Sequence, residues 1–250
     1  MTAQDSRGDR RPRGSGTPAR YSRQIPMAMM GEAGQRTLSE SKVLVVGLGG
    51  LGTVVGSYLA AAGIGHITLV DDDVVEMSNL NRQFIYGDAV GEQKAPAAAA
   101  FLAKVNPNVQ VEPVVQSIQD AVLDWNAYDL AFDCLDNNES RQALNKGCRD
   151  AGVPLVHAGV DATRGQVFTS MPGVTACLRC MLPKGRQDRI PVFGPAAGAV
   201  ASIQASEGIR VLLERYPPLT GKILLMDLGD YSFETVEMER ADDCPVCQRD

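Results

Sequence analysis

Three glycines that follow a short apolar run are the first residues whose spacing indicates chemistry. The stretch VLVVGLGGLG (43–52) places Gly47, Gly49 and Gly52 in the pattern G-x-G-x-x-G, with Gly50 in the same turn. In nucleotide-binding units these positions allow a tight turn, a close approach of backbone to phosphate, and close packing of helix on strand. Asp71, about twenty residues further on, has the position of a carboxylate that binds a ribose hydroxyl. The pattern predicts a nucleotide site but does not distinguish ATP from NAD.

A polar run, SNLNRQF (78–84), favours ATP. It follows the second predicted strand, at the edge where open α/β sheets bind ligands, and it contains Asn79 and Arg82. Lys94 adds a second cation at the start of a predicted helix. Two cations and an amide suit a triphosphate, because negative charge builds up there during phosphoryl chemistry. Either cation taken alone is equally well explained as a solvated surface charge.

An acidic residue follows another apolar strand, in the sequence CLDNNESR (134–141). Asp136 is expected at the same ligand-binding edge of the sheet, where a carboxylate can hold Mg²⁺ against phosphate oxygens. The alternative is that Asp136 or Asn137 caps the helix that follows. Position in the sequence does not decide between these two roles.

Two C-x-x-C pairs, CLRC (177–180) and CPVC (244–247), supply soft metal ligands. Each pair is a chelating turn, and together they complete a closed tetrahedral Cys₄ site of the structural zinc type. Such a site ties the C-terminal segment back to the region after the sheet. Two redox pairs or free thiols are the alternatives. The predicted zinc ligands are Cys177, Cys180, Cys244 and Cys247.

Alternating apolar strands and amphipathic helices position these residues. The alternation predicts an α/β fold, with a doubly wound, Rossmann-like, mostly parallel sheet and a C-terminal antiparallel extension. Strands are predicted at 43–46, 66–71, 109–115, 130–134, 154–158, 165–170, 222–226 and 232–237. Helices are predicted at 27–38, 50–62, 94–105, 118–125, 138–151 and 196–213. Residues 20–250 are expected to form one domain, preceded by a disordered tail at 1–19.

Charge and hydropathy exclude several classes of protein. The net charge of −6 argues against a partner that is a nucleic acid or a membrane surface. No apolar run approaches the length of a bilayer span, and the N-terminus lacks the apolar centre of a signal peptide. We therefore expect a cytoplasmic protein.

The order of RYSRQ (20–24), GLGGLG, SNLNRQF, Lys94 and CLDN resembles the ubiquitin-activating-enzyme-like adenylating family, which includes the ThiF, MoeB and HesA proteins. The resemblance implies a homodimer that uses ATP and Mg²⁺ to adenylate the C-terminal glycine carboxylate of a ubiquitin-like sulfur carrier protein. It also implies the paired zinc cysteines and a set of residue roles. Asp71 would bind the ribose, Asn79, Arg82 and Lys94 the phosphates, Asp136 the Mg²⁺, and Arg23 the ATP of the partner subunit.

The chain departs from many relatives between residues 185 and 198, where a further cysteine is expected and Gln187 stands about in its place. This absence favours adenylation without covalent sulfur chemistry on the protein. Cys134 and Cys148 are expected to be small apolar fillers, and neither His66 nor His157 has a partner motif. Alternative functions are adenylation of a small-molecule or peptide carboxylate, a non-catalytic nucleotide-binding scaffold, and an NAD dehydrogenase.

Overall fold

The structure is a computed structural model that describes residues 19–181, 191–214 and 217–247. Most of the predicted tail and the Gln187 position lie outside these ranges. Ala19, assigned to the tail, instead begins a short 3₁₀ helix, η1 (Ala19–Tyr21). No helix of the described residues is long and apolar enough to cross a membrane.

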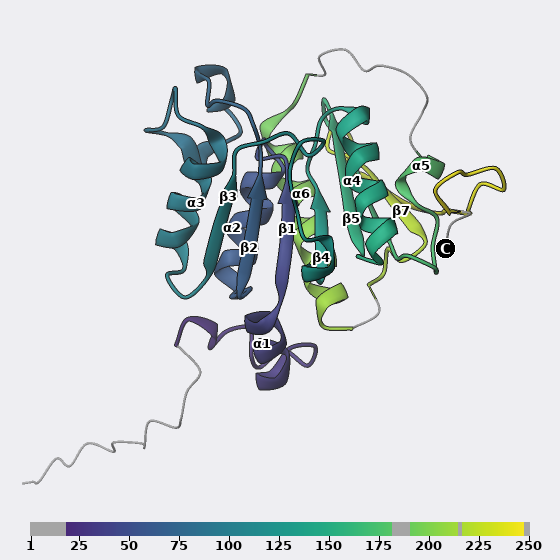
Figure 1. Cartoon of the computed structure of the whole chain (residues 1–250), viewed down its shortest axis with the longest axis horizontal. Helices are drawn as coiled ribbons and strands as arrows, with labels where there is room; N and C mark the ends of the chain where they lie inside the picture. The colour runs from purple at the N-terminus through teal and green to yellow at the C-terminus, as the bar shows by residue number, and fades with distance from the viewer. Residues whose placement is uncertain (1–18, 182–190, 215–216, 248–250) are drawn as a thin grey trace, which may run out of the picture.

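One sheet of eight strands runs through the described chain in the order β3-β2-β1-β4-β5-β6-β7-β8. Neighbouring strands from β3 to β5 are parallel, and those from β5 to β8 are antiparallel, as predicted (Figure 1). The strands are β1 (Lys42–Val46), β2 (His66–Val70), β3 (Gln110–Val114), β4 (Leu130–Asp133), β5 (Leu155–Asp161), β6 (Arg164–Ser170), β7 (Lys222–Asp227) and β8 (Ser232–Glu237). The helices are α1 (Gly31–Glu40), α2 (Gly52–Ala62), α3 (Lys94–Val105), α4 (Asn138–Ala151), α5 (Leu178–Met181) and α6 (Gly194–Leu212), with 3₁₀ turns η2 (Met77–Asn79), η3 (Phe84–Tyr86) and η4 (Trp125–Ala127).

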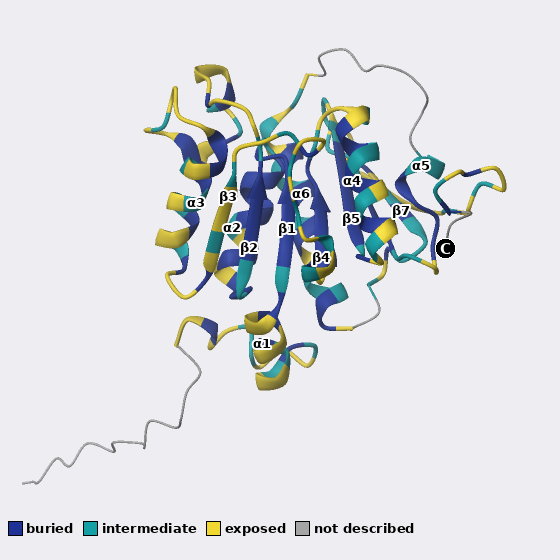
Figure 2. Cartoon of the chain, in the orientation of Figure 1, coloured by how far each residue is buried: buried dark blue, intermediate teal, exposed yellow. Residues whose placement is uncertain are grey.

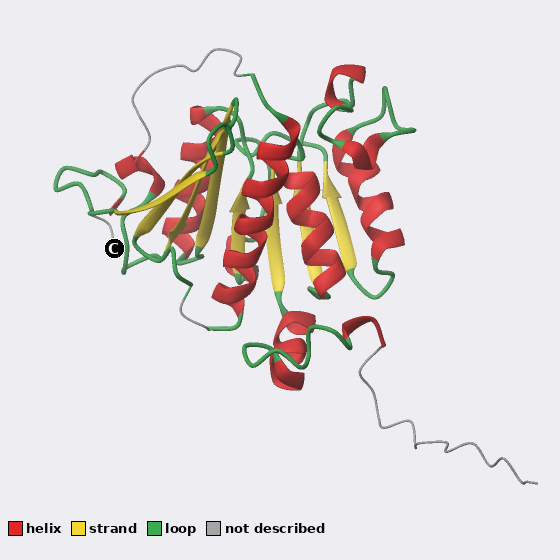
Figure 3. Cartoon of the chain, turned by 180° about the vertical axis from the view of Figure 1, so that it is seen from behind, coloured by secondary structure: helices red, strands yellow, loops and turns green. Residues whose placement is uncertain are grey.

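Two hydrophobic layers cover the central strands on opposite faces. Val43 and Val45 of β1 pack in the layer that contains α2, α3 and α6, whereas Leu44 and Val46 pack in the layer that contains α4. Figure 3 shows α2 and α6 across the back of the sheet, and Figure 2 shows the central strands buried along most of their length. Burial on both faces explains why these strands are continuous apolar runs.

The helix predicted at 118–125 is wrong. Ser117 begins one turn, because its carbonyl accepts hydrogen bonds from the backbone N–H groups of Asp120 and Ala121, but no α-helix follows before the 3₁₀ turn η4. The side chain of Gln119 instead hydrogen-bonds the Ser140 hydroxyl, 3.1 Å away on α4. Ile118, Leu123 and Trp125 still pack in the α4 layer, whereas Val122 is exposed, so the segment buries only part of the apolar pattern that suggested a helix.

The first helix begins later than the predicted residue 27. Residues 27–30 form turns, and Gly31 has a φ of +60°, a conformation that glycine adopts readily. α1 therefore starts at Gly31 and continues to Glu40. It lies below the amino ends of the parallel strands in Figure 1.

Candidate nucleotide-binding site and cysteine cluster

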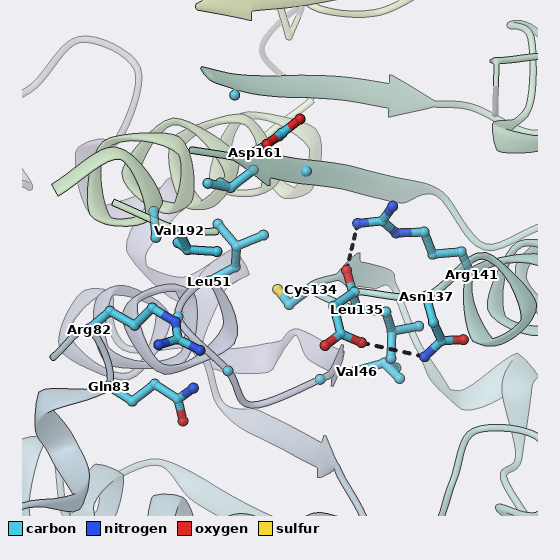
Figure 4. A pocket seen from close by; sticks show the side chains of 18 of the residues that line it. Val46, Leu51, Arg82, Gln83, Cys134, Leu135, Asn137, Arg141, Asp161 and Val192 are labelled. Carbon is cyan, nitrogen blue, oxygen red and sulfur yellow. Dashed lines mark hydrogen bonds between the residues drawn. The ribbon is translucent and has the colours of Figure 1, made fainter. Parts of the chain in front are cut away.

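A cleft of about 1640 Å³ lies at the carboxyl ends of the parallel strands. Figure 4 shows Arg82 and Gln83 on one side of it, and Leu135, Asn137 and Arg141 on the other. Ligand pockets usually measure roughly 300–1,000 Å³, so this cleft has room for a nucleotide and the end of a second molecule.

The glycine turn connects β1 to α2 at the floor of the cleft. Gly47 has a φ of +87°, and a Cβ at this position would lie 2.7 Å from the carbonyl oxygen of Cys134. A Cβ on Gly52 would lie 1.9 Å from the carbonyl oxygen of Gly47. These two positions therefore require glycine, while Gly49 and Gly50 line the cleft itself.

Asp71 is joined to the glycine turn by hydrogen bonds. Its two carboxylate oxygens accept from the backbone N–H of Leu48 at 2.6 Å and of Asp73 at 2.8 Å. Burial raises the pKa of Asp71, and the nearby Lys94 ammonium opposes that shift. Each oxygen of an ionised carboxylate has two acceptor positions, so each retains one for a ligand hydroxyl.

Lys94 is the first residue of α3 and lines the cleft, although only 6% of the residue is exposed. Its Nζ lies 2.6 Å from the carboxylate of Asp73. When no ligand is bound, this ion pair offsets the cost of burying the positive charge of Lys94. A phosphate bound to Lys94 must compete with Asp73 or share the ammonium with it.

Arg82 and Asn79 lie together on the segment that includes η2. The Nη1 atom of Arg82 donates to the carbonyl of Ser78 at 3.2 Å, and the Oδ1 atom of Asn79 accepts from the backbone N–H of Glu76 at 3.0 Å. Both residues line the cleft. The amide nitrogen of Asn79 and the remaining guanidinium N–H groups are the donors available to a phosphate.

In the loop after β4, the roles of helix cap and possible Mg²⁺ ligand, which the sequence did not assign, belong to two different residues. Asn137 caps α4, since its Oδ1 accepts from the backbone N–H of Ser140 at 2.9 Å. Asp136 is exposed at the cleft, and among the described residues its carboxylate has one side-chain hydrogen bond, at 3.5 Å, from the amide of Asn137. The carboxylate of Asp136 thus remains accessible to a cation.

A buried polar network that the sequence did not predict lies beneath this loop. The Nδ1 atom of His157 lies 2.7 Å from a carboxylate oxygen of Asp133, and both side chains are fully buried. The other oxygen of Asp133 accepts from the backbone N–H of Leu135 at 3.0 Å, and Arg141 donates to the Leu135 carbonyl at 2.6 Å (Figure 4). The only signal in the sequence was a histidine and an aspartate, each within or ending an apolar strand. Their pairing requires the β4–β5 register, in which Asp133 lies directly beside His157.

Arg23, which was predicted to contact ATP, lies away from the cleft of its own subunit. The neighbouring Gln24 donates to the carbonyl of Ala62, at the far end of α2 from Gly52. The 11 residues of α2 span roughly 16 Å at about 1.5 Å per residue. This distance exceeds the length of an arginine side chain, so Arg23 does not reach the cleft of its own subunit.

The four cysteines of the two C-x-x-C pairs come together beside α5. Their sulfur atoms lie within 4.8 Å of one another, with Sγ separations of 3.7 Å for Cys177 and Cys244 and 3.5 Å for Cys180 and Cys247. A tetrahedral site with Zn–S bonds of about 2.3 Å has sulfur atoms about 3.8 Å apart. A disulfide would bring two sulfurs to about 2.05 Å. The arrangement therefore fits a closed metal site better than two disulfides.

The two other cysteines are buried in the apolar layers. Burial raises the pKa of the Cys134 and Cys148 thiols, which makes both poor nucleophiles. They act as the small apolar side chains that the sequence predicted.

A family model described as the ThiF family matches residues 21–246. The chain belongs to the ThiF family. Among curated relatives of this ThiF-family chain, the "SAMP-activating enzyme E1" of Haloferax volcanii is 42% identical over 91% of the chain and 88% of that protein. The "Molybdopterin-synthase adenylyltransferase" of Escherichia coli is 39% identical over 91% of the chain and 95% of that protein.

A solved structure described as Escherichia coli MccB with ATP is also similar to this ThiF-family chain. It has a TM-score of 0.75 and 25% identity, covering 86% of this chain and 68% of that one. The resemblance noted from the sequence motifs is thus confirmed at the level of the family and the fold.

Proposed function

We propose that this chain is an ATP-dependent adenylyltransferase that activates the C-terminal glycine carboxylate of a ubiquitin-like sulfur carrier protein. The observation that carries the proposal is one cleft lined by the glycine turn, by Arg82 and Lys94, and by Asp136. Relatives named as sulfur carrier protein adenylyltransferases support the substrate, including one from Thermus thermophilus that is 38% identical over 91% of this chain.

In this proposal the ATP is held along the strand ends. Asp71 binds the ribose, and the glycine turn lies against the phosphates. Asn79, Arg82 and Lys94 contribute donors and positive charge to the triphosphate, with Lys94 shared between phosphate and Asp73. These groups are placed before the reaction, so they stabilise charge that develops at the phosphorus without having to reorganise.

The donor set fits Mg²⁺ at Asp136. Magnesium prefers carboxylate and phosphate oxygens, and Asp136 has an exposed carboxylate that helix capping does not use, because Asn137 forms the cap. The cation would draw charge from the phosphate oxygens and so favour departure of pyrophosphate. The contribution of the chain is to hold this carboxylate opposite the two cations.

The nucleophile in this proposal belongs to the substrate. A carboxylate oxygen of the carrier attacks the α-phosphorus of ATP, the bond to the bridging oxygen breaks, and pyrophosphate leaves with its electron pair. Residues of the cleft orient the two molecules and stabilise charge, which alone can supply much of the rate enhancement. No cysteine of the chain is assigned a covalent step, since Gln187 stands where many relatives have one and Cys134 is buried.

A structural zinc ion at Cys177, Cys180, Cys244 and Cys247 fits the sulfur separations described above. Four thiolates leave no open coordination position, so the ion would take no part in adenylation. It would fasten the segment after β8 to α5, where the hydrophobic contacts are otherwise few.

The proposal includes a homodimer in which each Arg23 serves the other subunit. Arg23 is exposed and lies at the opposite end of α2 from its own cleft. Two copies related by a two-fold axis make equivalent contacts with each other, so the Arg23 of each subunit would complete the site of its partner.

Pyrophosphate exchange into ATP tests the function. Purified protein with Mg²⁺ is assayed with sulfur carriers ending in Gly-Gly, with the same carriers lacking the last glycine, and with simple carboxylic acids such as acetate. We expect exchange only with the intact carriers. Exchange with acetate and not with carriers would favour the small-molecule alternative, and ATP binding without any exchange would indicate a non-catalytic scaffold.

A further inference from the structure

His157 connects the loop that carries Asp136 to the far wall of the cleft. Its Nδ1 faces Asp133 at the end of β4, and its Nε2 lies 3.0 Å from the side-chain nitrogen of Gln166 on β6. Asp133, His157 and Gln166 thus form a chain of hydrogen bonds across three adjacent strands. The adenylation chemistry described above uses none of these three side chains.

The charges around His157 determine which atom carries its proton. One oxygen of Asp133 accepts from the backbone N–H of Leu135, and the other lies 3.7 Å from the guanidinium of Arg141. A carboxylate oxygen that faces a cation acts as an acceptor, so Nδ1 of His157 donates the hydrogen between them. Burial lowers the pKa of His157, which leaves Nε2 unprotonated and able to accept from Gln166.

This hydrogen bond sets the orientation of the Gln166 amide. If the amide were reversed, its oxygen would face the lone pair of His157 Nε2, and two acceptors would be in contact. The amide nitrogen therefore points to His157. Within the described part of the chain, Oε1 of Gln166 has no hydrogen-bond partner.

Gln166 lies where the second substrate would enter the cleft. It lines the cleft, and its side chain passes over Gly159, where an added Cβ would be 3.3 Å from the amide nitrogen. The loop that carries Asp136 follows β4, and β6 is the second strand along the sheet from β4. At about 4.8 Å per strand, β6 is roughly 10 Å from β4, on the side away from β2 and Asp71.

We propose that Gln166 binds the acyl substrate, with its Oε1 accepting a hydrogen bond from a main-chain N–H near the reacting carboxylate. His157 and Asp133 are positioning residues that hold the Gln166 amide in the orientation that presents this oxygen. The inference rests on the proposed adenylation and specifies its substrate class. A peptide carboxylate has the required N–H group, and a simple carboxylic acid lacks it.

Gln166→Met tests the contact, because it retains the length of the side chain and removes the acceptor. With the carrier that gives the fastest exchange in the wild-type protein, we expect the KM for the carrier to rise about three- to tenfold. The Kd for ATP alone should remain within twofold, because Gln166 lies beyond the nucleotide. Gln110→Met is the matched control. Gln110 also lies on a strand, β3, and its Oε1 lies 3.3 Å from Nδ1 of His66, but it does not line the cleft.

His157→Leu tests the positioning role. We expect it to raise the KM for the carrier, and we expect the double variant with Gln166→Met to have the same KM as Gln166→Met alone. Additive effects would overturn the role of His157. If His157→Leu does not fold, Gln166→Met still decides the main proposal.

The outcomes separate this inference from the function on which it depends. An unchanged carrier KM in Gln166→Met, or a rise in the Kd for ATP that matches the rise in KM, overturns the assignment of Gln166 and leaves the adenylation proposal intact. Absence of exchange in the wild-type protein with every carrier overturns both.

Discussion

Replacing Gly52 by alanine is expected to damage the nucleotide site through a steric clash at its base. Gly52 is the first residue of α2, where alanine would otherwise be favoured by up to about 1 kcal/mol. The added Cβ would lie 1.9 Å from the Gly47 carbonyl oxygen, and real Cβ atoms essentially never come within 3.0 Å of a neighbour. The turn and the helix must therefore separate by about 1.1 Å, the difference between these two distances.

The clash is expected to outweigh the gain in helix propensity. Gly47 has little room on the other side, because a Cβ placed on it would lie 2.7 Å from the carbonyl oxygen of Cys134. Overpacking of this kind costs about 1–3 kcal/mol, which lowers the melting temperature of a chain this size by roughly 2–12 °C. A displacement of about 1 Å at the phosphate-binding turn should reduce the rate of exchange about a hundredfold.

Calorimetric melting, ATP titration and pyrophosphate exchange measure these effects on one preparation of Gly52→Ala. Gly198→Ala is the control, since it introduces the same methyl group within α6 where nothing lies within 4 Å. We expect the control to keep its exchange activity and to melt at or above the wild-type temperature. If Gly52→Ala binds ATP and melts like the wild type, the steric argument for the turn is wrong.

Three further predictions concern the dimer, the zinc site and a buried acid. For the dimer, equal amounts of Arg23→Ala and Asp136→Ala subunits are unfolded and refolded together. The mixture should regain about a quarter of the wild-type exchange, because half of the dimers are mixed and each mixed dimer has one complete site. No recovery would contradict the role of Arg23 in the partner's site. Cys244→Ser should bind less than one zinc per chain by elemental analysis and melt at a lower temperature, whereas full zinc content would rule out the Cys₄ site. Burial raises the pKa of Glu207 in the folded state above its ordinary value of 4.5. The protonated form therefore stabilises the fold fully below pH 4.5, and this stabilisation is lost as the pH rises through the folded-state pKa. The melting temperature of the wild type relative to Glu207→Gln should therefore rise as the pH is lowered from about 7.5 to about 5, and a constant difference would argue against the shift.

Features that depend on short stretches of chain were predictable from the sequence. The three-glycine turn, Asp71 and the polar run around Arg82 are each read within a few residues, since tight turns and strand ends have local requirements. The order of apolar strands and helices likewise predicted the parallel sheet and its antiparallel extension, because burial on both faces imposes a local pattern.

Local periodicity was misleading where side-chain contacts compete with the helix. Apolar residues between Ile118 and Trp125 suggested a helix, but the Gln119 side chain hydrogen-bonds α4, and the segment buries Ile118 while it leaves Val122 exposed. A hydrophobic pattern indicates which residues are candidates for burial, but the tertiary contacts decide which of them are buried and against which partner.

The amino-acid sequence by itself determined the kinds of chemical group available to the cleft and the strands that carry them. Only the tertiary structure decided how those groups are used. It placed Asn137 on the end of α4 and left Asp136 accessible, paired His157 with Asp133, and put Arg23 at the far end of α2. The physical reason is that hydrogen bonding depends on which strands and helices become neighbours, and residues far apart in the chain meet only after the sheet has formed.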